Sequence, residues 1–336
     1  MANHQDFSII NPAEIANTYE RIKNYIHKTP IITSSLLNNK LGHQIYFKAE
    51  MLQKTGAFKI RGAMNKLLTL KENNQLPKAV SAFSSGNHAQ GLALAANILG
   101  IKSIIFFPEN VSPIKLQATK AYGAEVIMVK TRKEAEEKAA LMEKDDIKFI
   151  HAYSDDDIIL GQGTACFEAI RQIKEDYSAE LDAIFVPCGG GGLTSGTFLA
   201  KSLLSQKTKL FAAEPLLAND ATTSYKTGKI FKFNDTPQTI ADGVRTLAIS
   251  ERTFYYLKQL DDFIEISEEE IINWTYLLIH TLKLVTEPTS ALAMAAAYKW
   301  LQTQPTPQKI LIILSGGNID PTTTKYIMDN YQNIMI

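Results

Sequence analysis

The sequence predicts an α/β fold built on mostly parallel sheets. From about residue 44 onward, short apolar runs alternate with longer segments of helical periodicity, which is the pattern of β-α-β units around a parallel sheet. Several of the short runs, such as Ile310–Leu314, are apolar throughout. Strands buried on both faces have this composition.

The strands and helices are expected to alternate along the chain. The predicted strands, short and rich in β-branched or aromatic residues, are Gln44–Lys48, Ala79–Phe83, Ser103–Phe107, Val126–Val129, Ala183–Pro187, Leu210–Ala213, Phe263–Ile266 and Ile310–Leu314. The predicted helices, with apolar residues three or four positions apart, are Asn87–Leu99, Ile114–Tyr122, Arg132–Glu143, Gly163–Glu175, Leu193–Leu204, Glu268–Leu282 and Ser290–Leu301.

The length of 336 residues suggests two domains, at roughly 100 to 200 residues per domain. Because no linker rich in Pro, Gly or Ser separates two halves, the domains are expected to share chain crossings. The β-α-β-α block of residues 74–155 is predicted to form a small substrate-binding domain. It would be inserted in a large domain made of residues 1–73 and 156–336, with the cleft between them as the natural site.

Charge and cysteine content exclude several classes of partner. The chain has 35 Lys and Arg against 35 Asp and Glu, so it lacks the basic excess of nucleic-acid binders and the polybasic stretch of peripheral membrane proteins. Cys166 and Cys188 cannot supply a disulfide framework. With no signal-peptide pattern or long apolar span, we expect a cytoplasmic protein that takes a small-molecule substrate.

A run of four glycines is the strongest local motif. Gly189, Gly190, Gly191 and Gly192 follow an apolar strand and precede a helix that begins near Leu193. Such a turn exposes backbone N–H groups to an anion, aided by the helix N-terminus. A merely flexible turn is the alternative. Because neither G-x-G-x-x-G nor a Walker lysine motif is present, a monophosphate is the favoured ligand.

Two further turns follow predicted strands. Ser84-Ser85-Gly86-Asn87-His88 offers N–H groups, hydroxyls and an amide that suit a substrate carboxylate. Taken singly, Ser or Asn here is also a common helix cap, and His88 a common structural residue. Ser315-Gly316-Gly317-Asn318 closes the last buried strand. Three such turns at strand ends predict a ligand crevice.

Lys59 is the candidate nucleophile. Most lysines are solvated surface charges, but Lys59 follows the aromatic Phe58, has small and apolar neighbours, and would open a helix. A lysine held in such surroundings can become a neutral amine that forms a Schiff base with an aldehyde. The four-glycine turn is predicted to bind a monophosphate, and we call it the phosphate cradle. Together with Lys59, it suggests pyridoxal 5'-phosphate as cofactor.

These motifs together resemble the serine racemase and threonine dehydratase family of fold type II pyridoxal-phosphate enzymes. The matching segments run in order from about residue 10 to 320: Lys54–Ala63, Ser84–His88, Gly161–Thr164, Gly189–Gly192, Ile240–Gly243 and Ser315–Asn318. The resemblance implies two open, twisted, mostly parallel sheets flanked by helices, with the small domain inserted in the large one.

The resemblance also implies roles around the cofactor. Lys59 corresponds to the Schiff-base lysine, Phe58 packs against the ring and Asn87 meets the ring hydroxyl. Ser315 faces the pyridine nitrogen, and Gly243 lies along the other edge of the cofactor. The phosphate ligands implied are Gly189, Gly190, Gly191, Gly192 and the N–H of Leu193.

The resemblance assigns binding of the substrate carboxylate, and the stereochemistry of the reaction, to the turn Ser84–His88, which we call the serine-rich turn. Ser84, Asn87 and His88 are implied to line the carboxylate site. Ser85 corresponds to the second acid/base of racemases, where dehydratases usually carry alanine. Glu287-Pro288-Thr289 is also racemase-like, whereas His88-Ala89-Gln90-Gly91 is dehydratase-like, so the markers are mixed.

A divalent-cation loop is implied at Glu214–Asp220, with Glu214, the Ala218 carbonyl and Asp220 as ligands. Oxygen ligands of this kind suit Mg²⁺ or Ca²⁺. Without the resemblance, the two carboxylates would be taken for a solvated loop. A homodimer is also expected.

The expected function is therefore deamination of L-serine and L-threonine together with interconversion of L- and D-serine. A 3-hydroxyaspartate ammonia-lyase shares the racemase-like markers and is the alternative. A non-catalytic pyridoxal-phosphate carrier is a further alternative, but it would need no turn that binds a substrate carboxylate. A nucleotide-binding regulator would need a phosphate-binding motif that this sequence lacks. Cysteine synthases usually have Thr where this chain has His88.

Overall fold

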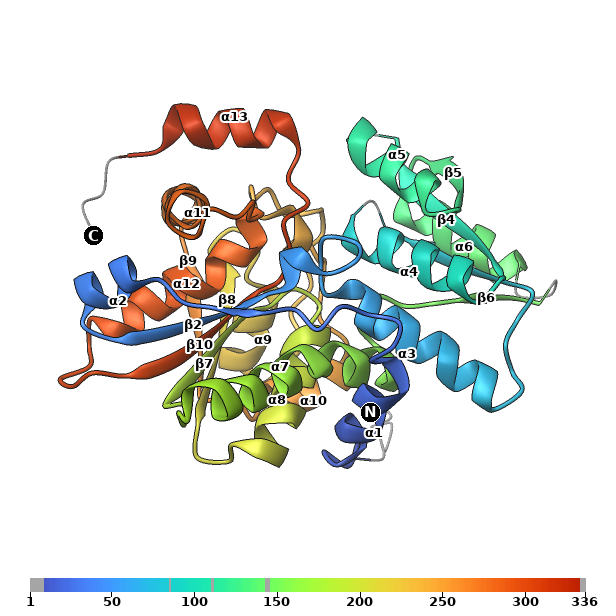
Figure 1. The fold of residues 1–336 in the computed structure, drawn as a ribbon. Coiled ribbons are helices and arrows are strands. Elements are labelled where there is room, and N and C mark those ends of the chain that lie inside the picture. Colours follow the sequence, from blue (N-terminus) through green and yellow to red (C-terminus); the bar gives the residue numbers. More distant parts are fainter. Residues whose placement is uncertain (1–8, 85, 110–111, 143–145, 333–336) are drawn as a thin grey trace.

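The computed structural model describes residues 9–84, 86–109, 112–142 and 146–332. These residues form two lobes, each built around its own sheet with helices on both faces (Figure 1). Ser85 lies outside the described residues.

The larger sheet has six strands in the order β1-β2-β10-β7-β8-β9. All neighbours are parallel except β1, which is antiparallel to β2. The strands are β1 (Ile31–Ile32), β2 (Gln44–Ala49), β7 (Ala183–Pro187), β8 (Lys209–Pro215), β9 (Asp262–Ile266) and β10 (Lys309–Leu314).

The smaller sheet has four parallel strands in the order β5-β4-β3-β6. They are β3 (Ala79–Phe83), β4 (Lys102–Pro108), β5 (Glu125–Val129) and β6 (Ile147–Phe149). The predicted fold class, with two mostly parallel sheets flanked by helices, is confirmed. The domain boundaries at residues 74 and 155 stay a prediction.

Helices cover both faces of each sheet. They are α1 (Glu14–Ile22), α2 (Ser35–Leu41), α3 (Lys59–Glu72), α4 (Asn87–Ile98), α5 (Pro113–Ala121), α6 (Arg132–Met142), α7 (Asp156–Tyr177), α8 (Gly192–Leu204), α9 (Asp220–Thr227), α10 (Glu251–Leu257), α11 (Glu268–Leu282), α12 (Pro288–Leu301) and α13 (Pro321–Asn330), together with the short 3-10 helices η1 (Glu50–Leu52) and η3 (Asp242–Val244). On the smaller sheet, α3 and α4 pack against one face and α6 against the other.

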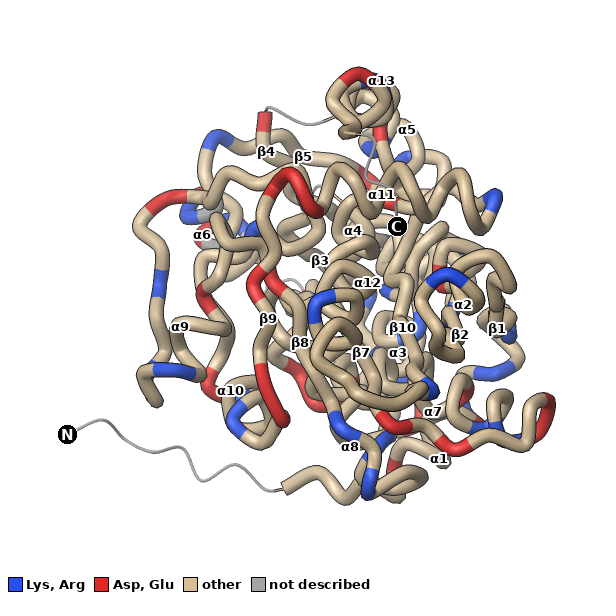
Figure 2. The backbone as a smooth tube through the Cα atoms, turned by 90° about the vertical axis from the view of Figure 1, so that its left-hand side faces the viewer, with Lys and Arg blue, Asp and Glu red and all other residues tan. Residues whose placement is uncertain are grey.

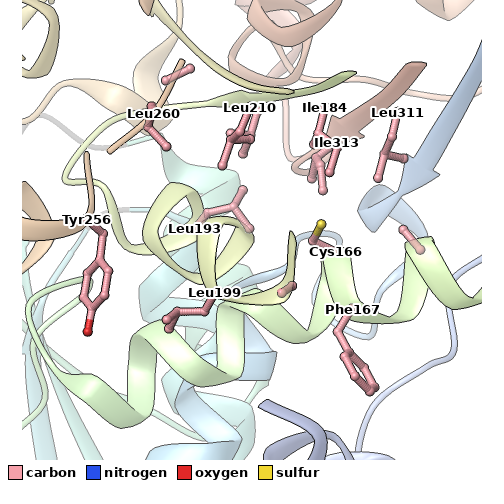
Figure 3. Packing of buried hydrophobic residues seen from close by; sticks show 14 of the residues in the cluster. Cys166, Phe167, Ile184, Leu193, Leu199, Leu210, Tyr256, Leu260, Leu311 and Ile313 are labelled. Atoms are coloured by element: carbon pink, nitrogen blue, oxygen red, sulfur yellow. The ribbon is translucent and has the colours of Figure 1, made fainter. Parts of the chain in front are cut away.

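The core explains why the central strands are apolar throughout. Alternate residues of β10 face opposite layers: Leu311 and Ile313 pack towards α7 and α8, and Ile310 and Ile312 towards α11 and α12. Figure 3 shows the first of these layers, with Ile184, Leu311 and Ile313 lying above Cys166. Burial on both faces is what the continuous apolar run predicted.

The sequence missed the shortest elements. β1 and β6 have two and three residues, too few for a periodic pattern, and α1, α2, α9, α10 and α13 were not predicted. The helix predicted from Gly163 begins earlier, at Asp156, because the side chain of Asp155 accepts hydrogen bonds from the N–H groups of Asp157 and Ile158. The opening of a helix at Lys59 is confirmed.

Charges of both signs are spread over the two lobes (Figure 2). This distribution fits the formal net charge of +0. Among the described residues, no helix is long and apolar enough to cross a membrane.

Candidate active site

A cavity of about 1020 Å³ is lined by residues of both lobes. The ends of β3, β7 and β10 lead into it, as expected of a crevice at the carboxyl ends of parallel strands. It gathers the predicted cofactor and substrate residues that the structure describes: Phe58, Lys59, Ser84, Asn87, His88, Gly189, Gly190, Gly191, Gly192, Leu193, Gly243 and Ser315. Glu214, Ala218 and Asp220 do not line this cavity.

Lys59 occupies the first position of α3 and is half-buried at the cavity wall. Its Nζ donates a hydrogen bond to the backbone O of Ala152 at 3.3 Å and lies 5.0 Å from the centre of the Phe58 ring. Desolvation lowers the pKa of Lys59 to about 8, although the negative charge of Glu287 acts in the opposite direction. A neutral, nucleophilic amine is therefore accessible near pH 8.

The tetraglycine loop joins the end of β7 to the start of α8. Tyr153, which also lines the cavity, packs closely against it: a Cβ placed on Gly190 would lie 2.3 Å from Cδ1 of Tyr153. The Tyr153 hydroxyl donates to the backbone O of Ala248 at 3.0 Å, which holds the ring in place. The loop thus presents backbone, without side chains, at a helix N-terminus. This arrangement fits a phosphate group.

Asn87 begins α4 and joins the two lobes through its side chain. Its Nδ2 donates to both carboxylate oxygens of Glu287, at 2.9 and 3.1 Å, and its Oδ1 accepts from Nδ2 of Asn318 at 2.8 Å. The backbone N–H of Asn318 also donates to Glu287, at 3.2 Å. These contacts orient the Asn87 amide at the cavity.

Glu287 is a site residue whose role the sequence did not reveal. Its carboxylate is buried, and desolvation together with the charge of Asp242 raises its pKa to about 7. In the sequence it precedes Pro288 at the start of a helix, where an acidic residue normally serves the helix N-terminus. The sequence around Tyr153, by contrast, contains no pattern that could have identified Tyr153 as a site residue.

His88 is held as a neutral side chain. Its Nε2 lies 3.2 Å from the backbone O of Ile150. Desolvation, with the nearby charge of Lys59, lowers the pKa of His88 to about 3. The ring therefore carries no charge at physiological pH and offers a ligand only its shape and hydrogen bonds.

Ser315 follows β10 and places a hydroxyl in the cavity lining. Its Oγ lies 3.0 Å from Oγ of Ser290, which in turn donates to the backbone O of Gly316 at 2.8 Å. The residue before Ser290, Thr289, accepts a hydrogen bond at its Oγ1 from the N–H of Gly243 at 3.0 Å. Both contacts fix residues that the sequence assigned to the cofactor.

An ion pair joins the lobes at the cavity. Lys115 of α5 pairs with Asp242 of η3, and both residues line the cavity. Nothing in the sequence indicated this pair, because the two residues are 127 positions apart.

Two buried carboxylates lie at the end of β8. Glu214 accepts hydrogen bonds from the N–H of Ala221 at 3.2 Å and from the N–H of Thr222 at 2.6 Å. Asp220 accepts from Oγ1 of Thr246 at 3.3 Å, while its Oδ2 is buried without a partner. Desolvation raises the pKa of both carboxyls, that of Asp220 to about 7. Within the described ranges, no three His, Cys, Asp or Glu residues gather to hold a metal.

Comparisons with known proteins agree with this geometry. Residues 22–316 match the sequence profile of a family described as pyridoxal-phosphate dependent enzyme. The chain is 41% identical over 310 residues to the L-threo-3-hydroxyaspartate ammonia-lyase of Saccharomyces cerevisiae, covering 91% of this chain and 93% of that protein. It is 40% identical over 310 residues to the serine racemase of Schizosaccharomyces pombe, covering 91% and 94%.

Solved structures give the same result. The crystal structure of a threonine deaminase from T.th. has a TM-score of 0.86 and 42% sequence identity, covering 92% of this chain and 98% of that chain. The resemblance inferred from the motifs is thereby confirmed, and so is the fold type. The chain belongs to the family of pyridoxal-phosphate-dependent enzymes that contains these ammonia-lyases and racemases.

Proposed function

We propose that this chain deaminates L-serine and L-threonine to 2-oxo acids and ammonia, and interconverts L- and D-serine. The observation that carries the proposal is the position of Lys59, whose amine faces the cavity that also contains the phosphate cradle and the serine-rich turn. Pyridoxal phosphate, when bound, supplies an electron sink for negative charge at the substrate α-carbon.

The residues present fit this cofactor. Gly189 to Gly192 and the N–H of Leu193 would hold the phosphate, because close packing of Tyr153 leaves room for backbone alone at Gly190. Lys59 would hold the aldehyde carbon, Phe58 would pack on the ring, and Asn87 and Gly243 would border it. Ser315 would face the ring nitrogen with a hydroxyl, which is too weak an acid to leave a proton there. The ring would therefore withdraw electrons only moderately. Because negative charge at the α-carbon would not accumulate, loss of the β-hydroxyl would follow rapidly.

Once the substrate amine has displaced it, the freed Lys59 amine would act as the base at the α-carbon. Its lowered pKa, about 8, places the neutral amine near the operating pH, where general-base catalysis is most efficient. Loss of the α-proton and of the β-hydroxyl as water, followed by hydrolysis, yields pyruvate from serine or 2-oxobutanoate from threonine, with ammonia.

Racemisation requires a second proton donor on the opposite face of the α-carbon. We assign this role to Ser85 from its position in the sequence, directly after Ser84, which lines the cavity. Ser84, Asn87 and the neutral His88 would bind the substrate carboxylate. Reprotonation by Ser85 competes with loss of the hydroxyl, so one enzyme can give both products.

L-threo-3-hydroxyaspartate is the second candidate substrate. The 41% identical relative is an ammonia-lyase of this name, and the cavity is also lined by Lys115, Lys130 and Arg245. Any of these cations could meet a second carboxylate. The side-chain carboxylate distinguishes this substrate from serine, so the ratio of the two activities decides between the candidates.

A substrate panel tests the proposal. Purified holoenzyme is given L-serine, D-serine, L-threonine and L-threo-3-hydroxyaspartate, and 2-oxo acid, ammonia and enantiomer are scored together, with and without Mg²⁺. The proposal requires ammonia from L-serine and L-threonine and the appearance of D-serine. Turnover of 3-hydroxyaspartate alone supports the second candidate, and cofactor binding without any ammonia release indicates a non-catalytic carrier.

We further propose a cation site for Mg²⁺ or Ca²⁺ at Glu214, the carbonyl of Ala218 and Asp220. Two adjacent buried carboxylates and an unpartnered Oδ2 on Asp220 fit a hard cation with oxygen ligands. Because these residues lie outside the cavity lining, the ion would stabilise the fold around α9. A homodimer is also expected, and sedimentation equilibrium checks it.

A further inference from the structure

A cluster of four buried charged side chains is built around Arg61, two residues after Lys59 in α3. We call it the Arg61 cluster: Lys48 of β2, Glu50 of η1, Arg61 of α3 and Glu168 of α7. All four are at most 2% exposed. Neither the cavity lining nor the proposed chemistry uses them.

The cluster is centred on the guanidinium of Arg61. Its Nε and Nη2 donate to the two carboxylate oxygens of Glu50, both at 2.8 Å, in a bidentate pair. Nη2 also donates to Glu168 at 3.2 Å, and Nη1 to Oγ1 of Thr164 at 3.4 Å. The Lys48 ammonium donates to Glu168 at 2.5 Å. The fork of Arg61 thus ties α3 to both η1 and α7.

The backbone of the same turn is also closely packed. A Cβ on Gly91 of α4 would lie 3.0 Å from the carbonyl carbon of Lys59. On the opposite side, a Cβ on Gly161 of α7 would lie 2.6 Å from the backbone O of Arg61. Helix α3 runs against α7 of the larger lobe and α4 of the smaller one (Figure 1), so these contacts enclose the residues around Lys59.

The Gly161-Gln162-Gly163-Thr164 motif supplies much of this enclosure. The side-chain carbonyl of Gln162 accepts from the N–H of Gly62 at 3.1 Å, and Thr164 accepts from Arg61. The motif lies outside the cavity lining. Gly161, Gln162 and Thr164 instead contact Arg61 and Gly62, in the turn that carries Lys59.

Stability alone is a weak explanation for the cluster. Removing charges from water is costly, and buried ion pairs are often replaceable by apolar residues without loss of stability. What a bidentate arginine adds is direction, since its planar fork fixes both partners in angle as well as distance. Such geometry is useful where one side chain has to be held within a fraction of an ångström.

We propose that the Arg61 cluster and the Gly161–Thr164 motif are positioning elements that fix the first turn of α3, and hence the Lys59 amine, against the larger lobe. Arg61 acts through the backbone and does not touch substrate. The inference rests on the proposed role of Lys59. It assigns a purpose to a motif and to four buried charges that the reaction itself leaves unexplained.

The test is Arg61→Lys, which keeps the charge and removes the fork. The matched control is Arg21→Lys, because Arg21 contacts the same helix beyond its first turn, at Asn65 in the middle (2.9 Å) and at Glu72 at the far end (2.9 Å). For Arg61→Lys we expect kcat to fall by about 10- to 100-fold with KM within about threefold, as for a misplaced catalytic group. The pH midpoint of the visible band of bound cofactor should also move, whereas Arg21→Lys should match the wild type in both.

A second variant covers the case in which Arg61→Lys fails to fold. Thr164→Val leaves all four charges in place and removes one contact of Arg61, so a smaller change of the same kind is expected. A lower melting temperature with unchanged kcat and band midpoint in both variants would overturn the inference. The proposed function fails separately, if wild-type holoenzyme releases no ammonia.

Discussion

The side-chain amide of Asn87 donates hydrogen bonds to both carboxylate oxygens of Glu287, at 2.9 and 3.1 Å. The two residues are 200 positions apart and belong to different lobes. Asn87 opens α4 beside the smaller sheet, and Glu287 precedes α12 of the larger one. The contact joins the substrate turn to the larger lobe, and it places a negative charge near Lys59.

Glu287→Gln should shift the titration of Lys59 to lower pH. The charge of Glu287 raises the pKa of Lys59, opposing the desolvation that lowers it to about 8. Removing that charge while keeping the side-chain shape leaves desolvation unopposed. The measurement is the rate at which cofactor-stripped protein forms the visible band as a function of pH, since only the neutral amine reacts. A midpoint that stays in place or rises contradicts this assignment.

The Lys115–Asp242 pair should contribute to substrate binding in a salt-dependent way. It joins α5 to η3 at the cavity, so removing it should loosen the arrangement of the two elements around the substrate. We expect Lys115→Met to raise KM for L-serine by about two- to fivefold, the range of a partly exposed pair. Asp242→Asn and the double variant complete a mutant cycle. If the two effects simply add, the pair is not coupled.

Ser85→Ala should suppress racemisation and retain dehydration of the L-substrate. If Ser85 protonates the face opposite Lys59, its loss removes the route to D-serine and leaves proton abstraction by Lys59 intact. D-serine and pyruvate are measured from the same reaction mixture. Ser84→Ala is the control, and it should weaken both activities together through carboxylate binding. Equal loss of both products in Ser85→Ala rules out the two-base scheme.

The acidic pair at α9 predicts how stability depends on pH and metal. The pKa of Asp220 is raised from 3.8 to about 7, so between these values the folded protein binds more protons than the unfolded chain. The free energy of unfolding of metal-free protein should therefore fall as pH rises from about 4 to 7. Melting temperatures with chelator should show this fall. Added Mg²⁺ or Ca²⁺, or Asp220→Asn, should reduce it, and curves that coincide with and without cation would argue against the site.

Much of the fold and the cavity could be predicted because the signals are local. Burial on both faces makes a strand such as β10 apolar throughout, and three glycine- or serine-containing turns at strand ends mark the crevice. The start of α3 at Lys59 followed from the same kind of signal. Short elements such as β1 and β6 exist through tertiary pairing and leave no periodic pattern.

The contacts that tune the site could not be predicted from the sequence. Glu287 next to Asn87, Lys115 next to Asp242, and Arg61 between Glu50 and Glu168 all join residues from separate elements. Each of the charged residues among them alone has the sequence appearance of a solvated charge. Their pairing depends on how the two lobes meet, which no local window of sequence specifies.

The most direct test of the account is the absorption spectrum of Lys59→Ala purified with added pyridoxal phosphate and then dialysed. The control is Lys54→Ala, which changes a lysine of the same segment that does not line the cavity. We predict that Lys59→Ala loses the visible band of the bound cofactor and releases no ammonia from L-serine, while Lys54→Ala keeps both. A band in Lys59→Ala that survives dialysis would show that another residue holds the cofactor and would contradict the central claim.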